Sequence, residues 1–162
     1  MNLVARVRWL YETLIRFGTL LQSPVLLVMR LYWGWSFFQT GKGKLGHLDD
    51  IAEYFTDLNI PFPKFNAILA GSTECIGGLL LLIGLASRLV SIPLIVIMLI
   101  AYWTADREAL TGIFEKPDAF LEATPFLFLL TCIFILSFGP GMFSIDWLLG
   151  KKLGSKPRSS GS

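Results

Sequence analysis

Two opposite charges lie inside long apolar segments, and they are the residues best placed to do chemistry. Arg30 lies near the middle of a predicted membrane span at residues 20–39, and Glu74 near the middle of a second at residues 65–85. A charge in hydrocarbon is costly, so it usually faces the bundle interior and has a partner. Each is about ten residues from the same end of its span, which places both roughly 15 Å below one membrane surface. Direct pairing of Arg30 with Glu74 is therefore feasible.

Such a pair has two interpretations. It either fixes helix register without chemistry, or it lines a polar pocket that handles a lipid headgroup, a quinone ring or a proton. In the second case Glu74 and Arg30 are the candidate catalytic residues. Trp33, Ser72 and Thr73 lie near them and are candidate ligand-binding residues.

The composition indicates that lipid is the solvent. Hydrophobic residues make up 54% of the 162 residues and charged residues 16%, and mean hydropathy is +0.62. Soluble domains carry about 25% charged residues. The net charge of +2 gives no support for nucleic-acid binding. No metal-ligand spacing is present, and Cys75 and Cys132, which lie in apolar runs, are expected to be free thiols rather than a disulfide.

The apolar runs predict an all-α fold, a bundle of four transmembrane helices at residues 20–39, 65–85, 89–104 and 123–138. The glycines at 41 and 43 are expected to end the first span, and the last two runs are short for the roughly 20 residues that a span needs. Residues 2–18 form an amphipathic, basic segment that can lie in the headgroup layer. We therefore divide the chain into an interfacial helix (1–19), a transmembrane domain (20–149) and a tail (150–162) that is either disordered or a cloning remnant.

The loop after the first span is acidic, with Asp49, Asp50, Glu53 and Asp57 interleaved with apolar residues at helical spacing. This pattern predicts a short amphipathic helix in the first outer loop, closed by a turn at residues 59–63. Lys and Arg are more frequent on the side of the membrane that holds the two termini. The bias predicts that both termini are cytoplasmic.

Three runs resemble the DoxX family of membrane proteins. They are MRLYWGWSFF at residues 29–38 with Gly41 and Lys44 behind it, AGSTECIGGLLLLIGL at residues 70–85 leading into SRL at 87–89, and FGPGMFSID at residues 138–146. The similarity extends over roughly residues 28–146.

This resemblance implies a four-helix domain in the cytoplasmic membrane of a prokaryote. The family is named after a subunit of an archaeal thiosulfate:quinone oxidoreductase, and other members are partners of soluble redox enzymes. The family's arginine on the first span and its glutamate on the second correspond to Arg30 and Glu74. The lysine that closes the first-span motif corresponds to Lys44, or to Lys42 if the register slips, and Lys44 joins the candidate ligand-binding residues. The N-terminal helix and the acidic insertion depart from the family pattern.

Two functions are expected in consequence. The first is a subunit associated with a redox complex that presents a polar intramembrane pocket to quinone or a similar amphiphile, with lipids and other subunits as partners. The second is a non-catalytic accessory or anchor subunit that docks through the acidic helix and the N-terminal helix. A carrier of small molecules or lipids is a weaker third, because neither an inverted repeat nor a pair of broken helices is evident. The chain shows no self-contained catalytic motif, so any electrons would be carried by a partner or by a diffusible quinone.

Overall fold

The computed structural model describes residues 3–154, and every regular element within that range is a helix. The elements are α1 (Leu3–Gly46), α2 (Leu48–Asp57), α3 (Pro63–Ile83), α4 (Ser87–Thr104), α5 (Arg107–Thr111), α6 (Pro117–Glu122), α7 (Pro125–Phe138) and α8 (Ile145–Gly154). Residues 1–2 and 155–162 lie outside the described range, and with them the start of the predicted N-terminal helix and most of the predicted tail.

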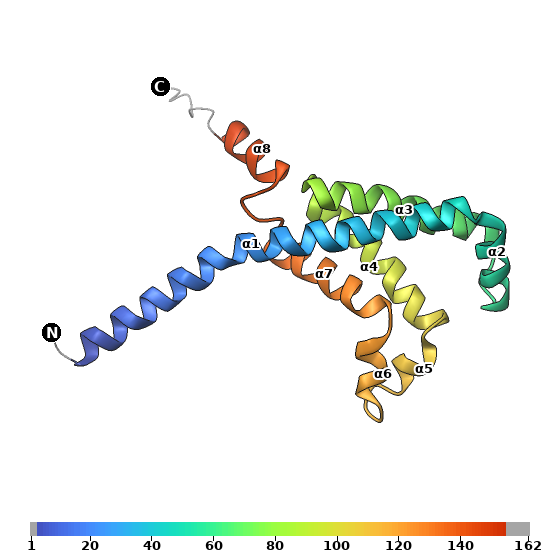
Figure 1. Ribbon diagram of the computed structural model, residues 1–162, viewed down its shortest axis with the longest axis horizontal. Coiled ribbons are helices and arrows are strands. Elements are labelled where there is room, and N and C mark those ends of the chain that lie inside the picture. Colours follow the sequence, from blue (N-terminus) through green and yellow to red (C-terminus); the bar gives the residue numbers. More distant parts are fainter. Residues whose placement is uncertain (1–2, 155–162) are drawn as a thin grey trace, which may run out of the picture.

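The bundle consists of two antiparallel helix pairs. α1 packs along α3, and α4 packs along α7 (Figure 1). Contacts of α3 with α4 and of α1 with α7 join the pairs around an apolar core. That core comprises Leu26, Phe37, Leu81, Leu94, Met98, Phe128, Cys132 and Ile135. We name the two ends of the bundle by the helices found there, the α2 end and the α8 end.

The helices have the length and composition of an all-α membrane bundle, as predicted. Three of them, α1, α3 and α4, are long and apolar enough to cross a bilayer. The fourth predicted span, α7, has only 14 residues, or about 21 Å of helix, against a hydrocarbon core of about 30 Å. α7 buries one face against its neighbours, including Phe128, Thr131 and Ile135.

The first span differs from its prediction at both ends, because α1 is one continuous helix of 44 residues. It does not separate at residues 18–20, so the predicted interfacial segment and the first span are one element. Residues 6–22 are all exposed, and this part of α1 extends beyond the bundle (Figure 1). α1 also continues through Gly41 and Gly43, which were expected to end it. Gly41 is needed for a close helix contact and therefore does not act as a stop signal.

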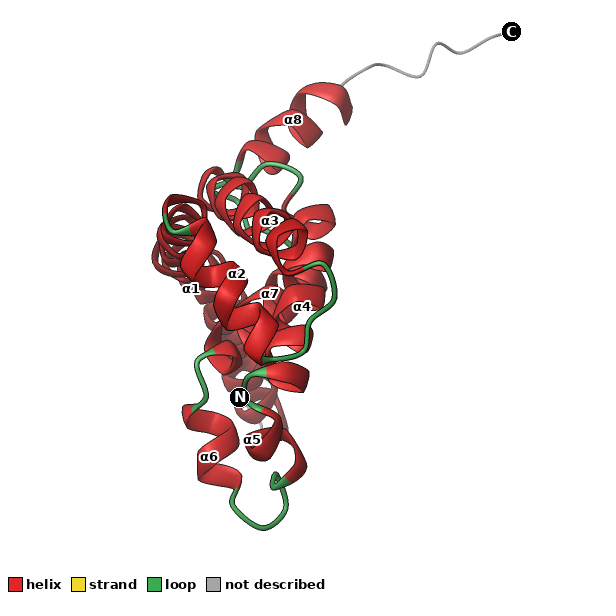
Figure 2. Cartoon of the chain, turned by 90° about the vertical axis from the view of Figure 1, so that its right-hand side faces the viewer, coloured by secondary structure: helices red, strands yellow, loops and turns green. Residues whose placement is uncertain are grey.

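The connections are more helical than predicted. α2 and the turn at residues 59–63 are confirmed, with Asn59 and Phe62 in the left-handed region at φ of 56° and 48°. α2 crosses the end of the bundle beside α3 (Figure 2). The loop from α4 to α7 contains α5 and α6, which were not foreseen. α8 runs to Gly154, so the beginning of the predicted disordered tail, including Lys151, is helical.

Glycines fix the register between α1 and α3. A Cβ on Gly78 would lie 2.5 Å from Phe38 N and 2.7 Å from Gly34 O, and one on Gly41 would meet the backbone of Gly71 and Cys75. Such distances leave no room for any side chain. The two backbones are therefore in direct contact, as is common where small residues line a membrane helix interface.

We expect Gly78→Ala to force α1 and α3 apart and to lower the free energy of unfolding by about 1–3 kcal/mol. Thermal unfolding in detergent micelles measures this change. The matched control is Gly43→Ala, because no atom lies within 4 Å of a Cβ at Gly43. Alanine is the better helix former by about 1 kcal/mol, so the control should be neutral or stabilising. Equal losses in both variants would contradict the close-packing role of Gly78.

Candidate functional site

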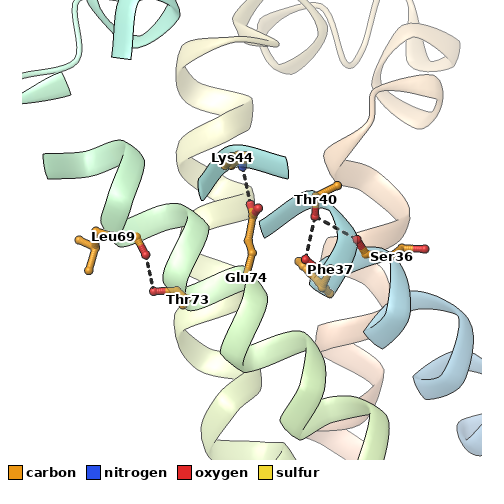
Figure 3. A network of polar contacts seen from close by, with 7 residues as sticks. All are labelled: Ser36, Phe37, Thr40, Lys44, Leu69, Thr73 and Glu74. Carbon is orange, nitrogen blue, oxygen red and sulfur yellow. Dashed lines mark hydrogen bonds and ion pairs between the residues drawn. The ribbon is translucent and has the colours of Figure 1, made fainter. Parts of the chain in front are cut away.

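Glu74 is buried in α3 and forms an ion pair with Lys44 at the end of α1. Lys44 Nζ donates to Glu74 Oε1 at 2.6 Å. The side chain of Glu74 is 1% exposed and that of Lys44 is 27% exposed, so the pair lies at the edge of the protein interior. Figure 3 shows the carboxylate of Glu74 directed at Lys44, with Thr40 of α1 beside it. Glu74 Oε2 has no hydrogen-bond partner among the described residues.

Arg30 does not pair with Glu74, which corrects the predicted direct contact. Its guanidinium donates from Nη1 to Pro140 O at 2.6 Å and from Nη2 to Phe143 O at 2.7 Å. Arg30 is 1% exposed and lies against Gly84, at the α8 end of α3. Arg30 therefore binds the loop of residues 139–144, which we call the closing loop.

The register and the side-chain direction separate the two charges. Arg30 lies against Gly84, directly after the last residue of α3. Glu74 precedes Gly84 by about ten residues, which separates the two levels by about 15 Å along the helix axis. The predicted equal depth was wrong because α1 continues to Gly46 instead of ending near Gln39. Helical side chains also point back toward the N-terminus of their helix. That direction takes Arg30 away from Glu74 and brings Lys44 toward it.

Asp146 completes the polar contacts at the α8 end, a role that was not assigned from the sequence. Its Oδ1 accepts from Ala86 N at 2.7 Å and its Oδ2 from Ser87 N at 2.9 Å, so the carboxylate caps the start of α4. Its own N–H donates to Gly84 O at 3.0 Å. A carboxylate that binds the free amides of a helix N-terminus stabilises it. Arg30 and Asp146 together hold the closing loop and the α3–α4 turn.

A cavity of about 450 Å³ opens beside Lys44 at the α2 end. We call it the α2 cavity; it lies between α2, the first half of α3 and the last turns of α4. Its lining is mostly apolar and is made by Lys44, Ile51, Tyr54, Phe55, Leu58, Asn59, Ile60, Pro61, Asn66, Leu69, Ala70, Ile97, Ile100, Ala101, Thr104 and Ala105. Leu69 and Ile100 line it while about half of each side chain remains exposed. The α2 cavity is therefore open toward the lipid-facing surface of the bundle.

The remaining candidate residues lie apart from this cavity. Trp33 packs against the core, with its ring 4.7 Å from that of Phe128. Thr73 donates its hydroxyl to Leu69 O at 2.8 Å, and Ser72 is only partly buried. Of the four predicted ligand-binding residues, Lys44 alone lines the α2 cavity. Cys75 and Cys132 are free, as expected.

The arrangement at the α2 end can bind an amphiphile with a polar acceptor group. Lys44 lines the cavity and still has N–H groups beyond the one donated to Glu74. Glu74 provides the balancing negative charge, and its unpartnered oxygen can accept a hydrogen bond or a proton. The apolar walls suit a hydrocarbon or isoprenoid chain.

Removal of Lys44 should leave Glu74 as an isolated buried charge. We expect Lys44→Met to lower the free energy of unfolding by up to about 3–5 kcal/mol, and the double variant Lys44→Met/Glu74→Gln to lose much less. Chemical or thermal unfolding in detergent compares them, with Lys42→Met as the control because Lys42 is exposed. A double variant as unstable as Lys44→Met would show that the pair is not coupled.

Arg30→Met should destabilise the α8 end of the bundle and leave the α2 end unchanged. Two charge-assisted hydrogen bonds are lost and two carbonyls become unpaired, at a cost of about 1.5–3 kcal/mol for each bond. Hydrogen exchange followed by mass spectrometry should show faster exchange at residues 139–148 and at the start of α4, with α2 unchanged. Faster exchange around Glu74 as well would indicate that Arg30 is coupled to it.

Comparison with known proteins agrees with this architecture. The chain is 31% identical to the uncharacterized membrane protein Rv3486 of Mycobacterium tuberculosis over 141 residues, which covers 80% of this chain and 83% of that protein. It is 25% identical to an uncharacterized protein of Haemophilus influenzae over 130 residues, covering 78% and 83% of the two chains. No solved structure matches. The DoxX family model matches residues 25–107, which include α3 and the part of α1 that packs against it, and the chain is therefore a small membrane protein of the DoxX family.

Proposed function

We propose that this protein binds quinone, or an amphiphile with a similar polar ring, in the α2 cavity, and that it does so as a subunit associated with a redox complex. The observation that carries the proposal is an apolar cavity lined by Lys44, the residue whose Nζ forms the ion pair with the buried Glu74. Arg30, which the sequence predicted as the partner of Glu74, does not line this cavity, and Lys44 pairs with Glu74 instead.

The chemistry of the cavity matches an amphiphile better than a water-soluble ligand. Its volume of about 450 Å³ lies in the range of small-molecule sites, which are apolar with a few polar groups that fix orientation. A ring carbonyl would accept a hydrogen bond from Lys44 Nζ. The tail would then lie along Leu69 and Ile100 and leave the cavity toward lipid.

Glu74 is proposed to orient Lys44 and to accept or release a proton when the ligand changes its redox state. Electrons would come from a partner protein, because the sequence has no recognisable motif for an electron-carrying cofactor. The link with redox complexes rests on the DoxX family resemblance. The location in a prokaryotic cytoplasmic membrane, with both termini in the cytoplasm, rests on that resemblance and on the distribution of Lys and Arg.

A specific observation also favours the accessory role. Asp50, Glu53 and Asp57 of α2 are exposed, and Asp49 forms only an exposed ion pair with Lys64 at 2.9 Å. α2 thus presents an acidic surface at the α2 end while its apolar face covers the cavity. A basic partner that docks there would lie directly over the proposed ligand site, so the two roles are compatible.

A photoreactive azido-quinone with a decyl chain tests ligand binding on the purified full-length protein. We expect the label to be attached to peptides from residues 51–70 and 97–105. Lys44→Gln should reduce labelling roughly tenfold or more, because a charge-assisted hydrogen bond is lost. Ala101→Phe, which fills the cavity and leaves the ion pair intact, should reduce it as well.

Two matched controls accompany these variants. Lys42→Gln removes an exposed charge two residues away on the same helix, and Ala119→Phe adds the same ring at an exposed position of α6. Both should be labelled as the wild type is. Equal labelling of Lys44→Gln and Lys42→Gln, or label spread over all lipid-facing helices, would overturn the proposal.

A further inference from the structure

A second and larger depression lies at the opposite end of the bundle. It has a volume of about 940 Å³ and is bounded by α1, the start of α4, the end of α7, the closing loop and α8. We call it the α8-end groove. Its walls combine apolar side chains with two arginines, Arg16 and Arg88. It contains neither Lys44 nor Glu74 and is independent of the proposed quinone site.

The two arginines are available to a ligand. Both are exposed. No hydrogen bond or ion pair joins Arg16 to any other described residue, and Arg88 uses Nη2 for one long contact with Ser137 O at 3.3 Å. A guanidinium has five N–H donors arranged to match phosphate oxygens. The groove therefore has donors for an anion on two of its walls.

The one carboxylate that lines the groove, Asp146, forms no ion pair with these arginines. Asp146 uses both oxygens for the amides of Ala86 and Ser87. Lys151 adds a further positive charge nearby, because its Nζ lies 5.4 Å from the ring of Trp147, which lines the groove. The electrostatic character of the groove is thus positive and fits a negatively charged group.

The apolar walls and the position of the groove select the kind of anion. Leu20, Leu89, Phe138, Met142 and Trp147 line it and are exposed. α3 ends and α4 begins beside it, so the groove lies where the spans leave the hydrocarbon, at the level of lipid phosphates. Basic pockets between membrane helices at this level bind anionic headgroups, and tryptophan is enriched there.

We propose that the α8-end groove is a binding site for an anionic phospholipid. Arg16 and Arg88 bind the headgroup phosphate from either side, and one acyl chain lies along Leu89, Phe138 and Met142. The lipid thus joins the exposed part of α1 to the start of α4.

Native mass spectrometry of the full-length protein in a neutral detergent tests the proposal. The probes are palmitoyl-oleoyl phosphatidylglycerol and phosphatidylcholine, which share their acyl chains and differ in net charge. We expect the wild type to bind phosphatidylglycerol roughly thirtyfold more tightly, as about 1 kcal/mol for each of the two arginines implies. Arg16→Gln/Arg88→Gln should bind the two lipids equally, and Arg16→Gln alone should lie between.

The matched control is Arg6→Gln/Arg107→Gln, which removes the same charge from two exposed positions outside the groove. It should keep the wild-type preference. Inorganic phosphate at millimolar concentration should compete poorly, because it lacks the acyl chain. Equal binding of both lipids to the wild type would overturn the proposal, as would an equal loss in the control, full competition by phosphate, or a protein dimer that forms in place of the lipid complex.

Discussion

The direct backbone contact between α1 and α3 is the constraint on which the rest of the structure depends. Gly34 and Gly41 of α1 meet Gly78 and Gly71 of α3, and a Cβ at Gly78 would lie 2.5 Å from Phe38 N. Such a contact tolerates no sliding, because a one-residue shift would drive a side chain into the opposite backbone. It sets which residues of the two helices share a depth, and so it sets which charges can meet.

The distribution of the charges follows from that register. Glu74 lies opposite the last turns of α1 and pairs with Lys44, whereas Arg30 lies at the other end of α3 and binds Pro140 and Phe143 carbonyls. Each intramembrane charge therefore has a local partner, a partially exposed lysine for Glu74 and backbone oxygens for Arg30, while Glu74 Oε2 and Arg30 Nε have no hydrogen-bond partner among the described residues. A charge that is buried needs a partner, but its burial does not determine which residue that partner is. The two ends of the bundle thus have different polar chemistry, and at the α2 end the lysine that pairs with the buried charge also lines a cavity.

The sequence predicted the helices better than it predicted their partners. Long apolar runs sufficed to place α3, α4 and α7 within about two residues, and the acidic amphipathic pattern sufficed for α2. The first span was misjudged because glycines at 41 and 43 were interpreted as stop signals, although Gly41 serves helix contact. The seven-residue spacing of Gly34 and Gly41, matched by Gly71 and Gly78, was the available signal for the register. Helical side chains point toward the N-terminus of their helix. Together with this direction, the register given by the glycines favours Lys44 over Arg30 as the partner of Glu74. The α2 cavity and the capping role of Asp146 depend on how the helices are placed relative to one another. A hydropathy pattern locates helices along the chain but does not give their relative positions.

A single helix, α1, contributes to both proposed binding sites, and this bears on whether they communicate. Arg16 lines the α8-end groove and Lys44 lines the α2 cavity, about 28 residues apart on one uninterrupted helix. Coupling between two sites requires an element with two arrangements that both ligands bias. Between these sites α1 is held by its glycine contacts with α3 and by the bonds from Arg30 to the closing loop. Tilting α1 would break those contacts, whereas residues 6–22, which are all exposed, can be repositioned without breaking any of them. Occupancy of the α8-end groove should therefore order the N-terminal part of α1 and leave the affinity of the α2 cavity unchanged.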